Sequence, residues 1–342
     1  MKTVATWLAL LWSISLCAQS KPIIFPNDLN PVSNGVKCFC KPGVKNKSRS
    51  RGLTISYTHL AGGDFEVENF DRQNPASAFD RFSTLLVDVK IPVINKPYFK
   101  LLAGYKYLNE AFTFRSFGNP DLPLLSGLND KRLKGNAYSL YVSKPLNEKF
   151  YLAFRVRAGF FGDYEEWMNF DSRYALLNGL ATFGIKKSDD KEWGFGVAIS
   201  KSFRRPNWLV LPFLFFNKNF NDDWGMEIVL PVSMYLRRNL NPKTIILGGF
   251  QFGSQSYSID LTPATTTTQS YAINHSEVIA QLSVERQLAP WVWANLRAGY
   301  QINFSNDFRL QSNFEEAINV DPDNGMIFQI GVFLSPPDRF IK

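Results

Sequence analysis

The chain contains only two histidines, the residue type that most often serves as general base in a hydrolase. His59 follows Thr58, and His275 lies between Asn274 and Ser276. General-base catalysis requires a histidine within hydrogen-bond reach of its nucleophile. Adjacent residues of a strand point to opposite faces, so Ser276 cannot serve His275 within one strand. A polar rim without catalysis is therefore favoured over an enzyme acting on lipid, and no catalytic residue is assigned.

Four acidic residues gather in one short segment, at Asp163, Glu165, Glu166 and Asp171. Carboxylates of this kind either bind a divalent cation or remain solvated in a loop, and the solvated reading is favoured. The sequence contains no Walker loop, zinc-ligand spacing or dinucleotide fingerprint. Gly-Phe-Gly at 194–196 lies within an alternating strand, where we expect small residues to admit neighbouring side chains. No metal and no cofactor is predicted.

Ten charged residues fall on the polar faces of alternating segments, and we expect them to line a lumen: Arg155, Arg157, Arg237, Arg297, Lys100, Lys106, Asp88, Glu227, Glu277 and Glu285. In one interpretation, opposite charges on neighbouring strands pair and fill the interior. In the other, basic groups line a pore or pocket that selects acidic solutes. The mixture of signs favours pairing.

Residues 291–304 show the alternation that places these charges. Val292, Leu296 and Phe304 fall on one face of an extended strand, while Trp293 and Arg297 fall on the other. Alternation of apolar and polar residues with a period of two over so many residues indicates a strand with one apolar face and one water-facing polar face. A tilted strand that crosses a bilayer needs roughly 9–11 residues, longer than the usual strand of about 5–6 in a soluble domain.

The N-terminus reads as a secretory signal over residues 1–18, with Lys2, an apolar run and cleavage after Ala18. Lipidation of Cys17 is the less favoured alternative. No later segment is apolar enough for a transmembrane helix. Residues 19–50 are rich in proline and polar residues and predict a flexible periplasmic extension. It contains Cys38 and Cys40, whose role is left open.

The net charge of +8 is modest for 342 residues, and no nucleic-acid module is visible. Basic residues are scattered except in the run Lys41–Arg51. Such a run either forms a solvated tether or contacts acidic lipid headgroups, and the tether is favoured.

Thirteen alternating segments are predicted as strands: 52–60, 81–93, 98–114, 134–144, 149–161, 174–187, 193–203, 207–216, 224–237, 243–257, 273–288, 291–304 and 325–334. Short and long connections alternate, as in bacterial barrels. Thirteen is odd, so either one segment between 193 and 257 does not span, or Pro231 divides 224–237 into two. Proline lacks the N–H that a paired strand donates to its neighbour, so it is rare in the interior of a sheet. Twelve strands are favoured, with fourteen next.

Residues 211–257 carry a recognisable pattern, with Leu-Pro, Asn, Trp224, a second Leu-Pro at 230–231, Tyr235-Leu-Arg-Arg and Leu247-Gly-Gly-Phe-Gln-Phe-Gly-Ser-Gln-Ser-Tyr257. This pattern resembles domain-of-unknown-function family 6268, outer-membrane β-barrel proteins common in Bacteroidetes-type bacteria. The resemblance implies location and architecture, and it brings no known activity or site.

We therefore expect an all-β fold, a transmembrane antiparallel up-and-down β-barrel over residues 51–342, in the outer membrane of a Gram-negative bacterium with both termini periplasmic. The expected partners are outer-membrane lipid, the barrel-assembly machinery and small solutes, without nucleic acid. The favoured function is a passive pore or a conduit for small solutes or lipophiles. The alternatives are a structural or binding barrel that acts through its outer loops and, last, a rim enzyme.

Overall fold

The computed structural model describes residues 42–67, 77–116, 132–202, 207–261, 269–310 and 317–336. Within these ranges the chain forms fifteen β-strands and one short 3-10 helix, η1 (Ser172–Tyr174). The strands are β1 (Leu53–Val67), β2 (Ser77–Lys96), β3 (Phe99–Ser116), β4 (Arg132–Pro145), β5 (Phe150–Gly162), β6 (Ala175–Ser188), β7 (Lys191–Ser202), β8 (Leu209–Asn219), β9 (Trp224–Leu230), β10 (Ser233–Asn241), β11 (Thr244–Leu261), β12 (Gln269–Gln287), β13 (Val292–Leu310), β14 (Ala317–Pro322) and β15 (Gly325–Leu334). No helix in the described ranges is long and apolar enough to cross a membrane.

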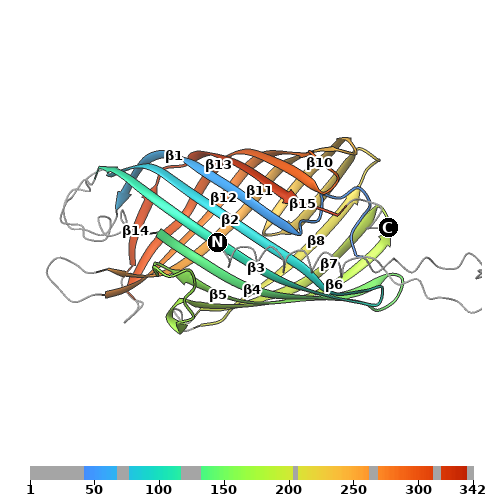
Figure 1. The fold of residues 1–342 in the computed structure, drawn as a ribbon, viewed down its shortest axis with the longest axis horizontal. Coiled ribbons are helices and arrows are strands. Elements are labelled where there is room, and N and C mark those ends of the chain that lie inside the picture. The colour runs from blue at the N-terminus through green and yellow to red at the C-terminus, as the bar shows by residue number, and fades with distance from the viewer. Residues whose placement is uncertain are drawn as a thin grey trace, which may run out of the picture. The chain divides into compact units, whose positions relative to one another are not determined.

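The strands close into a barrel, because each pairs antiparallel with the next and β15 returns to pair with β1 (Figure 1). The short strand β14 pairs with the far ends of β13 and β1, whereas β15 pairs with the remainder of the same two strands. Together β14 and β15 thus occupy one position in the wall, which gives a barrel of 14 strands. The predicted fold class is confirmed.

The favoured count of twelve strands is wrong, and the alternative of fourteen is right. The reason is the proline that the sequence singled out. Pro231 and Val232 form the turn between β9 and β10, so the segment 224–237 is a hairpin of two short strands. Dividing this one segment restores the even number that closure requires.

The two faces of the wall differ as the alternation predicts. On β13, Leu296 and Phe304 are 55% and 65% exposed. Trp293 and Asn295, which lie on the opposite face of the same strand, are only 2% and 5% exposed. On β5, Phe154 and Val156 are exposed. The outer face is therefore apolar, and the face toward the interior carries the charged side chains.

The hairpin β9–β10 is much shorter than β11, so the C-terminal part of β11 extends beyond β10 and approaches β5 instead. Ser258 of β11 meets Gly162 at the end of β5, and Asp163 N donates to the Ser258 carbonyl oxygen at 3.3 Å. A Cβ at position 162 would lie 2.5 Å from that same oxygen, so glycine is required for this approach. Strands β6 to β10 thus widen only one end of the barrel, a feature that the sequence did not predict.

The interior is less polar than expected, because aromatic and aliphatic side chains pack there in three clusters among the described residues. One cluster contains Tyr151, Phe213 and Phe215, and another contains Ile245, Leu247, Trp293 and Phe333. These residues share the inner face with the charges, since a period of two assigns a face and not a polarity.

Candidate functional site

All ten predicted lumen residues lie on the inner face of their strands. On β5, Arg155 and Arg157 alternate with exposed Phe154 and Val156, and the same alternation places the others. The inner set further includes Asp88 on β2, Lys100 and Lys106 on β3, Glu227 on β9, Arg237 on β10, Glu277 and Glu285 on β12 and Arg297 on β13. Their part in conduction stays a prediction.

Arg237 is the clearest case of internal pairing. Its side chain is fully buried, with Nη1 3.1 Å from Glu227 Oε1 and Nη2 donating to Asn219 Oδ1 at 2.5 Å. Gly225 makes room for it, because a Cβ there would lie 2.3 Å from Nη2. A buried guanidinium needs such partners, since an unpaired one pays its full desolvation cost. In this part of the wall, opposite charges satisfy one another.

Residues 42–51, which we call the N-terminal strap, lie along the rim of the mouth at the short-turn end. Lys45 N donates to the Asp189 carbonyl oxygen at 2.8 Å, in the turn between β6 and β7. Further along, Ser48 donates to the Glu227 carboxylate twice, from N at 2.8 Å and from Oγ at 2.6 Å. The strap thereby runs along the rim from the β6–β7 turn to the lumen-facing side of β9.

Two arginines complete the attachment of the strap before the chain enters β1. Arg51 forms an ion pair with Glu285, whose side chain is 1% exposed, and its guanidinium lies 4.5 Å from the centre of the Phe333 ring. Arg49 lies 5.1 Å from the centre of the Trp293 rings and donates to the Pro242 carbonyl oxygen at 3.2 Å. Cations over aromatic faces are favourable, more so when water is excluded.

The basic run is therefore neither a solvated tether nor a lipid contact in the part that the structure describes. The composition of residues 19–50 predicted flexibility, whereas residues 42–50 bond to the turns and inner walls of the barrel. Sequence reasoning missed this site because Glu227 and Ser48 are 179 residues apart in the chain. The signal sequence, Cys38 and Cys40 lie outside the described residues.

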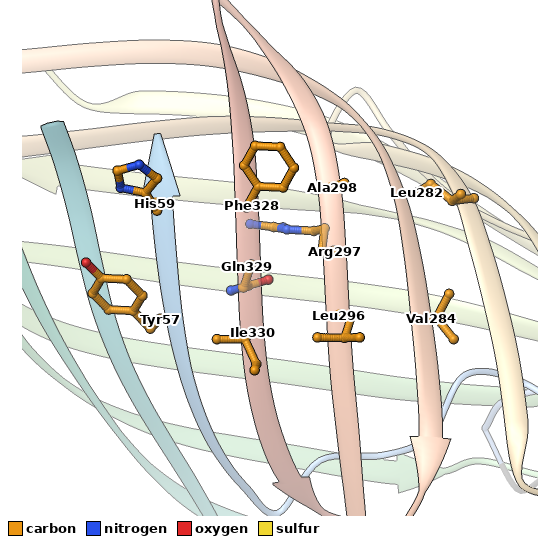
Figure 2. Close-up of a pocket in the computed structure, with 10 residues that line it drawn as sticks. All are labelled: Tyr57, His59, Leu282, Val284, Leu296, Arg297, Ala298, Phe328, Gln329 and Ile330. Carbon is orange, nitrogen blue, oxygen red and sulfur yellow. The ribbon is translucent and has the colours of Figure 1, made fainter. Parts of the chain in front are cut away.

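The two histidines lie on opposite faces of the wall, so they cannot share a site. His275 points inward, with its ring stacked at 6.5 Å on Tyr257. His59 points outward beside Tyr57, at the edge of an open groove of about 480 Å³ (Figure 2). Ser276 donates to Ser254 Oγ at 3.2 Å, on the other side of its strand from His275. His275 and Ser276 therefore do not form a catalytic pair within this strand.

The groove runs along the outer face of β1, β15, β13 and β12. Figure 2 shows Phe328 and Ile330 on β15, Leu296 on β13 and Leu282 on β12 around it. Such a lining offers dispersion contacts and few hydrogen bonds, which suits an acyl chain better than a polar substrate. We read it as part of the apolar outer wall.

The four acids of the loop after β5 do not converge on one point. Asp163 Oδ2 accepts from Asp260 N at 3.0 Å, while Asp171 caps η1 by accepting from Arg173 N at 3.0 Å. That hydrogen bond lowers the pKa of Asp171. No cluster of three or more potential metal ligands forms anywhere in the described ranges. The solvated-loop interpretation remains the favoured one.

The same loop folds back over the outer wall of β3 and β4. Trp167 stacks on Tyr107 with ring centres 4.6 Å apart, and the buried Asn136 side chain donates to Tyr164 Oη at 2.7 Å and to the Trp167 carbonyl oxygen at 2.9 Å. Burial raises the pKa of Tyr164 to about 12. Trp167 nevertheless remains 61% exposed. The loop thus presents an aromatic side chain at the barrel end opposite the strap.

The fold and its interior define a β-barrel whose N-terminal segment is bound along the turns and inner wall at the short-turn end. The chain belongs to the family described as a domain of unknown function (DUF6268), which matches residues 113–335 and confirms the resemblance. None of the curated proteins matches the chain in sequence.

Solved barrels are similar only at a distance. A FadL homologue of Pseudomonas aeruginosa is 11% identical, with 83% of this chain and 89% of that chain covered and a TM-score of 0.38. The Pseudomonas putida toluene transporter TodX is 10% identical, covering 83% and 89%, with a TM-score of 0.30. The Escherichia coli outer membrane protease OmpT is 9% identical, covering 85% and 99%, with a TM-score of 0.29. These values carry no argument about activity.

Proposed function

We propose that this protein is an outer-membrane barrel that conducts small solutes and that the strap holds it closed. The observation that carries the proposal is the way in which the strap is attached to the wall. The strap is joined to the wall by hydrogen bonds, ion pairs and cation–π contacts from outside the sheet, so it can leave without breaking a strand pairing. A barrel meant only as a scaffold has no need of a separate stopper.

The outer face supports the membrane location. Large apolar side chains are exposed around the wall, among them Val156 at 64% on β5, Phe195 at 49% on β7, Leu282 at 56% on β12 and Ile330 at 61% on β15. An apolar belt of this extent in water would favour aggregation. Against lipid it is the expected outer surface of a spanning barrel.

The ends of the chain support an orientation with both termini in the periplasm. The strap and the end of β15 lie at the short-turn end, since Ser335 N donates to the Trp291 carbonyl oxygen in the β12–β13 turn. Bacterial barrels keep short turns on the periplasmic side. We therefore place the strap in the periplasm and the loop 163–171 outside the cell.

The test is single-channel conductance of detergent-purified protein in a planar bilayer. We expect the unaltered chain to be silent or to open rarely, and the Ser48→Ala/Arg51→Ala variant to open steadily, because both changes remove strap contacts and leave the strand pairings intact. Lys47→Ala is the matched control, since the Lys47 ammonium makes no hydrogen bond or ion pair within the described residues. It should behave as the unaltered chain.

Deletion of residues 42–50 from the full chain is the stronger form of the same test. A deletion variant that folds, as judged by its mobility shift on heating in detergent, and still conducts nothing would overturn the conduit. Steady conductance from the unaltered chain equal to that of the deletion variant would remove the strap from the proposal.

One observation favours a second candidate, a barrel that binds a partner through its outer loop. Trp167 and Phe170 are 61% and 63% exposed beside the docked part of the loop. A silent barrel that loses ligand or surface binding on Trp167→Ala would support this reading. Because His275 and Ser276 lie on opposite strand faces, we assign no enzymatic activity.

A further inference from the structure

Charge is unevenly distributed over the inner wall. On the side formed by β9 to β13, each of the three lumen acids lies near a basic group. Glu227 pairs with Arg237, and Glu285 pairs with Arg51. Glu277 lies within electrostatic reach of Arg297. This side of the interior is therefore close to neutral.

The side formed by β2 to β5 has an excess of positive charge. Five cations point inward there: Lys90 on β2, Lys100 and Lys106 on β3, and Arg155 and Arg157 on β5. Asp88 faces Lys106 directly across the β2–β3 pairing, but its carboxylate lies 3.0 Å from Lys90 Nζ. The other nearby acid, Glu110, also interacts with Tyr257. Five cations thus share two carboxylates.

The register brings three of these cations together. Lys106 on β3 pairs with Ala137 on β4, which in turn pairs with Gly159 on β5. Arg157 is two residues from Gly159 on β5, so its side chain lies on the same inner face, one position along the strand from the level of Lys106. Arg155 follows on the same face of β5. The charges of Lys106 and Arg155 are each close enough to Arg157 to be repelled by it. Such a cluster is costly unless a counter-charge relieves it.

The two arginines meet neutral groups and no carboxylate. Arg157 Nε donates to Ser139 Oγ at 3.1 Å, and Arg155 interacts with the Tyr141 hydroxyl. Buried Arg155 Nε has no hydrogen-bond partner in the structure. No ion pair of Arg155 or Arg157 with a carboxylate forms among the described residues. The guanidinium groups are therefore held in position with donors to spare.

We infer that Arg155, Arg157 and Lys106 form an anion-binding site inside the barrel for the phosphate or carboxylate group of a small solute. Guanidinium donors suit both groups, because they offer paired N–H bonds to planar or tetrahedral oxyanions. A bound anion would neutralise the excess charge and accept from Arg155 Nε. The inference rests on the proposed conduit for its biological role, since it names the class of solute that the conduit takes.

The site is tested by equilibrium binding, which does not depend on conduction. Inorganic phosphate is titrated calorimetrically into the Ser48→Ala/Arg51→Ala protein, with sodium butyrate as the carboxylate probe and sodium chloride as the control for ionic strength. Arg155→Gln/Arg157→Gln in the same background should weaken phosphate binding by at least roughly tenfold, because two charge-assisted contacts are lost. The matched control is Arg297→Gln, an inner arginine opposite Ser283 on β12 and within electrostatic reach of Glu277, and it should bind within about threefold of its parent.

The outcomes separate the site from the conduit. Tighter binding of phosphate than of butyrate assigns the site to phosphoryl groups, and the reverse order assigns it to carboxylates. Equal binding by the double variant and its parent overturns the site, whatever the bilayer shows. If the folded variant lacking residues 42–50 is silent in the bilayer, but phosphate binding in the Ser48→Ala/Arg51→Ala protein still depends on Arg155 and Arg157, the conduit fails and the site stands.

Reversal potentials give an independent readout where the strap variant conducts. Under a salt gradient it should prefer anions, and Arg155→Gln/Arg157→Gln should abolish that preference, while Arg297→Gln retains most of it. An unchanged preference in the double variant would contradict the inference and leave the conduit standing.

Discussion

The inner face of β7 carries glycine at two positions, Gly194 and Gly196, because aromatic rings occupy the space that a larger side chain would need. A Cβ at Gly194 would lie 2.4 Å from the Phe215 ring and 2.2 Å from the Phe183 carbonyl oxygen. At Gly196 the corresponding distances are 2.4 Å to the Phe213 ring and 2.3 Å to the Ala181 carbonyl oxygen. Real Cβ atoms do not approach so closely, so even alanine must displace a strand or a ring.

We expect Gly194→Ala to destabilise the barrel by about 1–3 kcal/mol, the usual cost of overpacking. The change is measured as a lower midpoint of heat-induced unfolding in detergent, followed by gel mobility. Gly248→Ala is the matched control, since the nearest atom to its added Cβ is 3.6 Å away, on Leu282. Equal unfolding midpoints for the two variants would show that the Phe215 ring can move aside for a methyl group at position 194 without a loss of stability.

At this scale the sequence predicted a good deal. The alternation in 193–203 indicated that small residues there admit neighbours, and Phe213 and Phe215 are those neighbours. What it could not predict is which polar-face residues are packed in apolar clusters. Trp293 falls on the wet face by its period, yet Ile245, Leu247 and Phe333 surround it. Residues this far apart in sequence meet only after the barrel closes.

The loop after β5 behaves as an element of its own, docked on the outer wall by one stacked pair and one buried amide. Stacked aromatic rings contribute about 0.5–1.5 kcal/mol beyond their buried area. Trp167→Ala removes the stack on Tyr107 while the strands remain paired. We expect faster hydrogen exchange and protease cleavage in residues 163–171, with the heat-unfolding midpoint of the barrel nearly unchanged.

Glu165→Ala is the control for this experiment, because the Glu165 contact to Lys134 Nζ uses its carbonyl oxygen and survives the change. The loop should stay protected in that variant. Protection that persists in Trp167→Ala would mean that Asn136 and Tyr164 hold the loop without the ring.

Elements were predicted unequally well for physical reasons. Long strands were recognisable because a period of two persists over many residues, whereas the hairpin β9–β10 was recognisable only through Pro231. The strap has no period at all. Its position depends on Glu227 and Glu285, and nothing in the run from Lys41 to Arg51 indicates which carboxylates it meets.

The whole molecule raises the question of which solvent its outer wall faces, and a single exposed position can answer it. Val156 lies in the middle of β5 and is 64% exposed. In water, replacing an exposed valine by arginine changes stability within about 0.5 kcal/mol. Near the middle of a bilayer, the same change on a lipid-facing strand costs about 2–4 kcal/mol, because the charge loses its hydration.

We therefore expect Val156→Arg to lower the free energy of folding into lipid vesicles by about 2–4 kcal/mol, measured by urea titration. Val156→Leu keeps the position apolar and should fold like the unaltered chain. Arg155→Gln changes charge at the adjacent residue on the inner face, so it should escape the bilayer penalty. If Val156→Arg folds in vesicles as well as Val156→Leu, the outer face of β5 does not meet the hydrocarbon, and the membrane location falls together with the conduit that depends on it.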